Sequence, residues 1–158
     1  VLREALEGAG AQLGGLSLDD VLDALLAALR FAPYPEARAA LRGLRERGHR
    51  LVVVSNWDVS LHEMLDRTEL RELVDGAISS AEAGVAKPDP EIFRRALEIA
   101  GRPGQGGWHA GDSLEHDVAG AVAAGLRPVL VVRDGRPPAV PAGVEVIRSL
   151  DELPPLAA

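Results

Sequence analysis

The lysine content of this chain singles out one position. Sixteen of its 17 basic side chains are arginine, and the only lysine is Lys87. Pro88 and Pro90 follow it, so the segment is stiff and leads into a helix. Lysine offers a compact ammonium that reaches into a pocket, whereas arginine offers a planar fork. We therefore expect that function needs the Lys87 ammonium itself; the alternative is a solvated loop lysine.

Two aspartates follow in the segment Gly111–Asp117. We expect Asp112 to project from the end of a strand and Asp117 from the first turn of the next helix, which Ser113 can cap. Carboxylates so placed can hold Mg²⁺, which takes oxygen ligands and keeps several waters. The alternative, acidic residues that stabilise a helix N-terminus, explains Asp117 well and Asp112 less well.

A third segment, Ser55-Asn56, ends a short apolar run. A hydroxyl and free backbone N–H groups at a strand end can hold phosphate oxygens, although both residue types also favour plain turns. The four histidines show no zinc spacing, and we expect His109 to be a strand residue rather than a ligand.

The elements that must position these segments alternate from Pro35 onwards, which is typical of a parallel sheet with helices on both faces. Such sheets bind ligands beyond the carboxyl ends of their strands. Before Pro33 we expect two amphipathic helices, the second capped by Ser17 with Asp20. The remaining predicted helices cover 36–47, a segment from Ser60 with a capping box to Glu63, Asp89 to Gly101, and Ser113 to about Ala124. The predicted strands cover 51–54, 77–79, 108–110, 128–132 and 144–147.

The composition disfavours some classes of partner and excludes some kinds of site. The chain has 158 residues, a net charge of -7 and no cysteine. The acidic charge disfavours nucleic acid as a partner, and the short apolar runs disfavour a membrane. The missing cysteines exclude disulfides and thiolate metal sites. With no visible leader, we expect a cytoplasmic protein.

The order Ser55-Asn56, Lys87-Pro88 and Gly-Asp-Ser-x-x-x-Asp over Gly111–Asp117 resembles that of haloacid dehalogenase-like (HAD) hydrolases with a helical cap. The resemblance runs from about Val1 to Asp151. It implies an α/β fold: a Rossmann-like parallel sheet flanked by helices, with a partial helical cap at the N-terminus. Residues 1–32 would be a remnant of the cap and residues 33–158 the core domain.

The resemblance also implies roles. In the family an aspartate attacks the substrate phosphorus, and a second aspartate two residues later is the general acid and base. Ser55 and the backbone of Asn56 would bind the transferring phosphoryl group, and Lys87 would neutralise charge beside it. Asp112 would bind Mg²⁺, and Asp117 would bind it directly or through water. We therefore expect a Mg²⁺-dependent phosphatase of small phosphorylated metabolites.

The chain departs from the family pattern in one respect. The two aspartates should form an Asp-x-Asp motif at the end of a strand before the cap, yet Asp19, Asp20 and Asp23 fall in a helical pattern. We therefore expect a sequence truncated at its N-terminus, without its nucleophile or first strand, and inactive by itself. That strand lies centrally in the family, so its loss would leave two inner strand edges unpaired or force them together.

Three other functions are open to the sequence. A truncated, non-catalytic paralogue would bind a phosphorylated ligand or a partner. A 2-haloacid dehalogenase is disfavoured by Asp112, because dehalogenating members of the family need no metal. A phosphorelay receiver domain is disfavoured because Lys87 precedes Asp112. The oligomeric state is left open.

Overall fold

A computed structural model describes residues 17, 20–21 and 31–156. The chain divides into two compact units, residues 1–32 and 33–158. In the first unit, the Ser17 hydroxyl accepts from the Asp20 backbone N–H, and the Asp20 carboxylate accepts from the Ser17 N–H, which confirms the predicted cap. Most of the two predicted N-terminal helices lies outside the described residues. That residues 1–32 are a remnant of the family's helical cap domain therefore stays a prediction.

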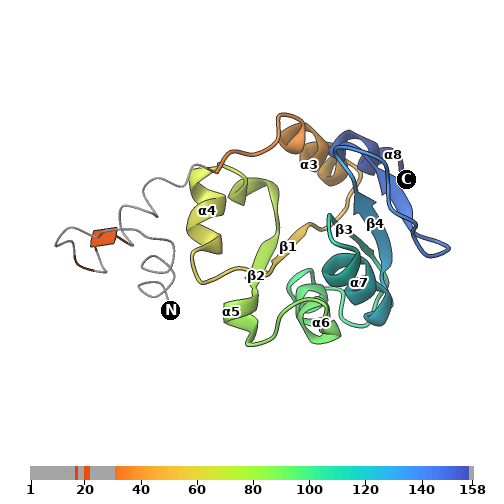
Figure 1. The fold of residues 1–158 in the computed structure, drawn as a ribbon. Helices are drawn as coiled ribbons and strands as arrows, with labels where there is room; N and C mark the ends of the chain where they lie inside the picture. The colour runs from red at the N-terminus through yellow and green to blue at the C-terminus, as the bar shows by residue number, and fades with distance from the viewer. Residues whose placement is uncertain (1–16, 18–19, 22–30, 157–158) are drawn as a thin grey trace. The chain divides into compact units, whose positions relative to one another are not determined.

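The second unit alternates strands and helices along the chain (Figure 1). Its elements are α3 (Ala37–Glu46), β1 (Val52–Ser55), α4 (Leu61–Arg67), η1 (Arg71–Leu73), β2 (Gly76–Ser79), α5 (Ser80–Ala83), α6 (Pro90–Ile99), β3 (Trp108–Gly111), η2 (Leu114–Val118), α7 (Ala119–Ala123), β4 (Arg127–Val131), β5 (Glu145–Ile147), η3 (Leu150–Glu152) and α8 (Leu153–Leu156). Each predicted strand is present, with no bound shifted by more than one residue.

All the described strand pairs are parallel, which confirms the α/β class. They form two sheets, however, with orders β1-β2 and β3-β4-β5. Val52 of β1 is in register with Gly76 of β2, and Trp108 of β3 with Arg127 of β4. Of the two outcomes expected for the inner strands, the structure shows the first: β1 and β3 have no strand between them and do not pair in the described part of the chain.

Alternation along β1 builds a core on both of its faces. Val52 and Val54 pack against a buried cluster that includes Ile92 and Phe93 of α6. Val53 packs on the opposite side, against a cluster that includes Leu61 of α4. Because successive strand residues point to opposite faces, one short apolar run binds helices on both sides of the sheet.

One of the following two predicted helix starts is confirmed and the other is wrong. Asp89 caps α6 by accepting from the Glu91 N–H, with Pro90 at the first helical position, as predicted. The predicted capping box from Ser60 to Glu63 is wrong, because the Ser60 hydroxyl accepts from no helix N–H group. Its oxygen instead accepts from the Trp57 indole N–H at 3.1 Å, and the hydroxyl donates to the Asp58 carboxylate at 2.5 Å. Side chains close in sequence thus form local hydrogen bonds with this hydroxyl in place of the helix cap.

The helix predicted from Ser113 does begin there, because the Ser113 hydroxyl accepts from the His116 N–H. Its first turn is nevertheless a π-helical turn, η2, before α7 continues. Among the described residues, no helix has the length and apolar character needed to cross a membrane.

Candidate functional site

The centre of the candidate site is an ion pair between Lys87 and Asp117. The Lys87 Nζ atom lies 2.6 Å from Asp117 Oδ1. Only 12% of the lysine side chain and 4% of the aspartate side chain are exposed. A buried charge is costly unless it is paired, and the Lys87 ammonium supplies the counter-charge to the buried Asp117 carboxylate. The unusual lysine is therefore buried at the point where Asn56 and Asp117, each following an inner strand, both contact it.

Asp117 reaches this position because of a glycine and a wide turn. A Cβ atom at Gly111 would lie 2.1 Å from Asp117 Cγ, so the carboxylate fits only over a residue without a side chain. The π-helical turn carries it there: the backbone N–H groups of Asp117 and Val118 both donate to the Ser113 carbonyl. π-helical turns of this kind recur at functional sites.

His109 also binds Asp117, which the sequence analysis missed. Its Nε2 atom lies 2.8 Å from Asp117 Oδ1, and its ring packs edge-on against Phe93. A carboxylate only accepts, so Nε2 carries the proton in this contact. The signal that could have found it is the strand period: residues two apart share a face, so His109 lies on the same side as the space above Gly111.

Asn56 holds the Lys87 backbone rather than leaving its side chain in solvent. The Asn56 Oδ1 atom accepts from the Lys87 N–H at 2.7 Å, and Nδ2 donates to the Lys87 carbonyl at 3.0 Å. These two bonds join residues 31 positions apart. Asn56 thereby fixes the lysine segment, whose Lys87-Pro88 peptide bond is cis, to the end of β1. A positioning role for this amide was not predicted.

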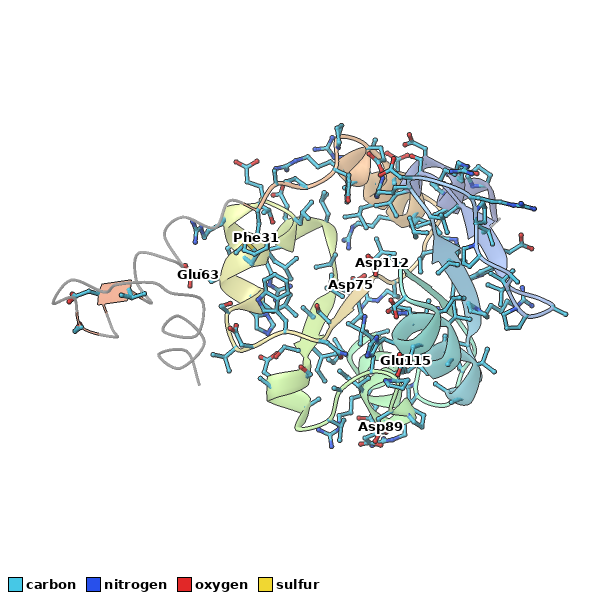
Figure 2. All side chains as sticks on the ribbon, viewed as in Figure 1. Phe31, Glu63, Asp75, Asp89, Asp112 and Glu115 are labelled. Carbon is cyan, nitrogen blue, oxygen red and sulfur yellow. The ribbon has the colours of Figure 1, made fainter. Side chains whose placement is uncertain are left out.

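The structure brings Asn56, Lys87 and Asp117 into one connected group, and places Ser55 and Asp112 beside it. Ser55 is the last residue of β1, is half-buried, and its hydroxyl makes no hydrogen bond with the described residues. Asp112 follows β3, is exposed, and has no partner among the described residues. Figure 2 shows Asp112 beyond the strand and Glu115 on the turn that follows.

The electrostatics of Asp117 come from opposing effects. Burial by itself would raise the pKa of the Asp117 carboxyl, but hydrogen bonds from His109 and Lys87, the lysine charge and the Ser113 N–H hold that pKa well below its usual range. Asp117 is therefore an anion across the physiological pH range, and it lies in contact with the Lys87 side chain.

The donor set is compatible with Mg²⁺ but does not enclose one. Asp112 offers an open carboxylate, and Asp117 offers a second whose oxygens already accept from Lys87, His109 and Ser113. No cluster of three His, Asp or Glu side chains suited to a metal occurs within the described residues. Mg²⁺ commonly binds one or two carboxylates and completes its shell with water and substrate phosphate. The residues thus fit an open Mg²⁺ site, at which Asp112 would be the more accessible carboxylate.

Comparison with known proteins gives a consistent picture. Residues 2–125 match the family described as haloacid dehalogenase-like hydrolase. Haloacid dehalogenase-like hydrolase domain-containing protein 3 of Bos taurus is 42% identical over 121 residues, covering 77% of this chain and 47% of that protein. Phosphoserine phosphatase of Thermus thermophilus is 37% identical over 139 residues, covering 87% of this chain and 55% of that enzyme.

A crystal structure of a dehalogenase is also similar, with a TM-score of 0.80 and 27% sequence identity, covering 99% of this chain and 70% of that one. The chain spans about half the length of the two curated relatives.

Proposed function

Because the chain belongs to the haloacid dehalogenase-like hydrolase family, we propose that it forms the phosphate-binding part of a Mg²⁺-dependent phosphatase of small phosphorylated metabolites. The observation that carries the proposal is the buried Lys87 ammonium, held against Asp117 and fixed to the end of β1 by Asn56. The similarity to a phosphoserine phosphatase supports a phosphomonoester as the substrate class.

Phosphoryl transfer depends mainly on positioning and charge neutralisation, and each residue contributes to one of these. The Ser55 hydroxyl, which has no partner in the described chain, donates to a phosphoryl oxygen. The Lys87 ammonium neutralises charge between the phosphate and the attacking group. Asn56 positions Lys87 through its backbone, and His109 positions Asp117.

Asp112 would hold the magnesium ion, with Asp117 beside it as a direct or water-mediated ligand. When bound, Mg²⁺ supplies further neutralisation of charge on the phosphoryl oxygens. The ion pair gives Lys87 and Asp117 their places before substrate binds, so little rearrangement is needed on binding.

The Asp-x-Asp pair expected for the family does not occur in the given sequence before Ser55. We propose that the 158-residue chain binds phosphate and Mg²⁺ but does not turn over a phosphomonoester by itself. We further propose that the enzyme acts in the cytoplasm on a small phosphorylated molecule.

The test separates binding from turnover. Binding of inorganic phosphate in the presence of Mg²⁺ is measured by calorimetry on the chain and on Ser55→Ala, Lys87→Met and Asp112→Asn. We expect all three variants to weaken phosphate binding by about tenfold or more, since a hydrogen bond to a charged group contributes about 1.5–3 kcal/mol. The control, Arg94→Met, replaces an exposed cation on α6 and should leave binding unchanged.

Two results would contradict the proposal. If Lys87→Met and Ser55→Ala leave the affinity for phosphate unchanged, these residues do not form the phosphate site. Mg²⁺-dependent hydrolysis of p-nitrophenyl phosphate by the unmodified chain would show that a nucleophile is present after all.

A second candidate is a 2-haloacid dehalogenase, which the similarity to a dehalogenase structure supports. The exposed carboxylate of Asp112 favours the phosphatase, because dehalogenating members of the family need no metal ion for such a carboxylate to bind. Halide release from a 2-haloacid without metal would reverse this preference.

A further inference from the structure

The loop that follows β1 is anchored to α5 by one side chain. The Ser80 hydroxyl accepts from the Trp57 backbone N–H at 3.1 Å and donates to the Trp57 carbonyl at 3.0 Å. A hydroxyl has one donor and two acceptor positions, so a single serine can bind both backbone groups of the same residue. The two residues are 23 positions apart. The contact therefore joins the segments that follow β1 and β2, and is not part of one local turn.

The anchored residue, Trp57, comes directly after the proposed phosphate-binding residues. These are Ser55, through its hydroxyl, and Asn56, through its backbone, at the carboxyl end of β1. The Asn56 side chain is itself bonded to the Lys87 backbone. Ser80 adds a second anchor one residue further along the chain. The loop is thus fixed at two consecutive residues, each time by a segment distant in sequence.

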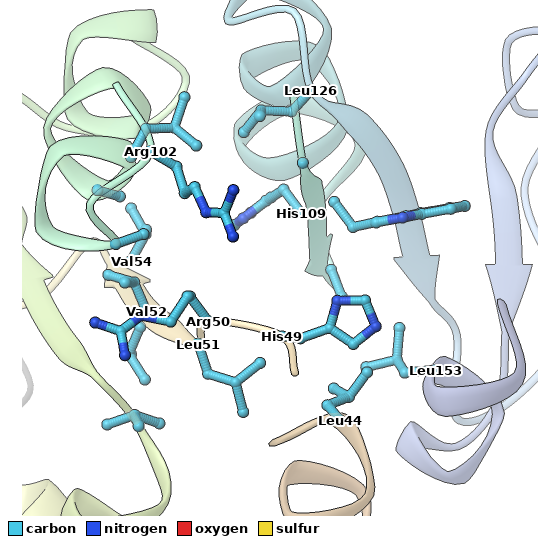
Figure 3. A pocket seen from close by; sticks show the side chains of 18 of the residues that line it. Leu44, His49, Arg50, Leu51, Val52, Val54, Arg102, His109, Leu126 and Leu153 are labelled. Carbon is cyan, nitrogen blue, oxygen red and sulfur yellow. The ribbon is translucent and has the colours of Figure 1, made fainter. Parts of the chain in front are cut away.

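The contact lies on the β2 side of β1. β2 pairs with all four residues of β1, and α5 follows β2 directly. The other side of β1 faces a cavity of ≈ 540 Å³, which Figure 3 shows with Val52 and Val54 on one side and His109 on the other. Neither Trp57 nor Ser80 lines this cavity. The anchor of the loop therefore depends on α5 and not on the packing around the cavity.

The short helix α5 is in turn held by three of its neighbours. Ser79, the fully buried last residue of β2, caps it, and the Glu82 carboxylate accepts from both the Ser79 N–H and the Ser79 hydroxyl. The other Glu82 oxygen lies 2.8 Å from His62 Nε2 of α4. The Arg95 guanidinium of α6 donates to the last carbonyl of α5. Because these contacts form without a ligand, the Ser80 hydroxyl is in place before phosphate binds.

A second serine contacts the same tryptophan in a different way. The Ser60 hydroxyl accepts from the Trp57 indole N–H at 3.1 Å and donates to the Asp58 carboxylate at 2.5 Å. It therefore binds the Trp57 side chain, whereas Ser80 binds the Trp57 backbone. Replacing either serine by alanine removes two hydrogen bonds from the same loop, so the two substitutions are a matched pair.

We propose that Ser80 is a positioning residue for the phosphate site. Its hydroxyl fixes the Trp57 backbone and thereby holds the Ser55 hydroxyl and the Asn56 backbone where both can bind phosphoryl oxygens. The inference rests on the proposed function, because it assigns a role within the same site. It adds a residue of α5, an element outside the three sequence segments from which the site was first predicted.

The test measures the affinity for inorganic phosphate with Mg²⁺ present, by calorimetry, on the unmodified chain and on Ser80→Ala, Ser80→Thr and Ser60→Ala. We expect Ser80→Ala to weaken binding about fivefold, which corresponds to about 1 kcal/mol, the net contribution of one hydrogen bond. Ser80→Thr keeps the hydroxyl and should restore most of the affinity. Ser60→Ala should leave the affinity close to that of the unmodified chain.

Two further measurements separate positioning from a general loss of stability. Amide hydrogen exchange, followed by NMR without phosphate, reports on the anchor itself. Exchange of the Trp57 amide should accelerate about fivefold in Ser80→Ala, but not in Ser80→Thr or Ser60→Ala. Urea denaturation should show a similar loss of stability in Ser80→Ala and Ser60→Ala, because each removes two side-chain hydrogen bonds. Only Ser80→Ala should also lose affinity for phosphate.

Several outcomes would overturn the inference. One is a Ser80→Ala variant that binds phosphate as tightly as the unmodified chain. Another is an equal loss of affinity in Ser60→Ala, which would assign the effect to stability. A third is that affinity for phosphate and protection of the Trp57 amide vary independently across the three variants. The proposed function fails in a different way, and the inference fails with it, if the unmodified chain does not bind phosphate or if Lys87→Met leaves its affinity unchanged.

Discussion

Replacing Lys87 with methionine tests whether the buried ion pair holds the site together. The substitution keeps a long, unbranched side chain but removes the ammonium from an Asp117 carboxylate that is only 4% exposed. Breaking a buried pair in this way costs about 3–5 kcal/mol. His109 and the Ser113 N–H still donate to Asp117, so we expect the lower end, about 3 kcal/mol.

The assay is urea denaturation at pH 7 in metal-free buffer, followed by circular dichroism and tryptophan fluorescence to establish a single transition. The same loss should lower the melting temperature by about 6–12 °C for a chain of this size. The matched control is Arg94→Met, because Arg94 is 55% exposed and its ion pairs should contribute no more than about 1 kcal/mol. A Lys87→Met loss as small as that of the control would refute the reasoning.

In the double variant Lys87→Met/Asp117→Asn the costs should be less than additive, because each single variant leaves a buried group without its partner.

Three further predictions concern the same group of residues. Since the pKa of Asp117 is lowered in the folded state, its contribution to stability is full above its unfolded pKa of about 4 and is lost as the pH falls through the lower folded value. The difference in urea stability between the unmodified chain and Asp117→Asn, measured in metal-free buffer, should therefore shrink from pH 7 to pH 2, and a constant difference would argue against it. Gly111→Ala forces a Cβ onto the Asp117 carboxylate and should destabilise the chain by about 1–3 kcal/mol in the same assay, whereas Gly106→Ala, with open space around it, should change little. Asn56→Ala removes both bonds to the Lys87 backbone, so exchange of the Lys87 amide should accelerate about fivefold for a net loss of about 1 kcal/mol, and unchanged exchange would mean that Asn56 does not fix this segment.

Local signals in the sequence were sufficient for most of the elements. The run at 51–54 and the Asp89-Pro90 start of α6 depend on near neighbours; the strand appears within one residue of its predicted bounds, and the helix begins as predicted. The Ser60 cap is absent because the hydroxyl oxygen accepts from the Trp57 indole N–H and not from the helix, and sequence spacing alone does not rank these two donors. The π-helical turn of η2 was missed for a different reason. It allows the buried Asp117 carboxylate to reach Lys87, a contact between residues 30 positions apart.

The sequence by itself determined the parallel α/β class, the family, and the identity of the polar residues at the strand ends. Those properties follow from periodicity, residue type and motif order, which are local or additive along the chain. Only the tertiary structure decided the contacts within the site. Asn56 hydrogen-bonds to the Lys87 backbone, His109 and Lys87 both bind the Asp117 carboxylate, and β1 and β3 do not pair. These contacts join segments distant in sequence, and their geometry is set by packing on α6 and by the missing side chain of Gly111, which no single window of sequence contains.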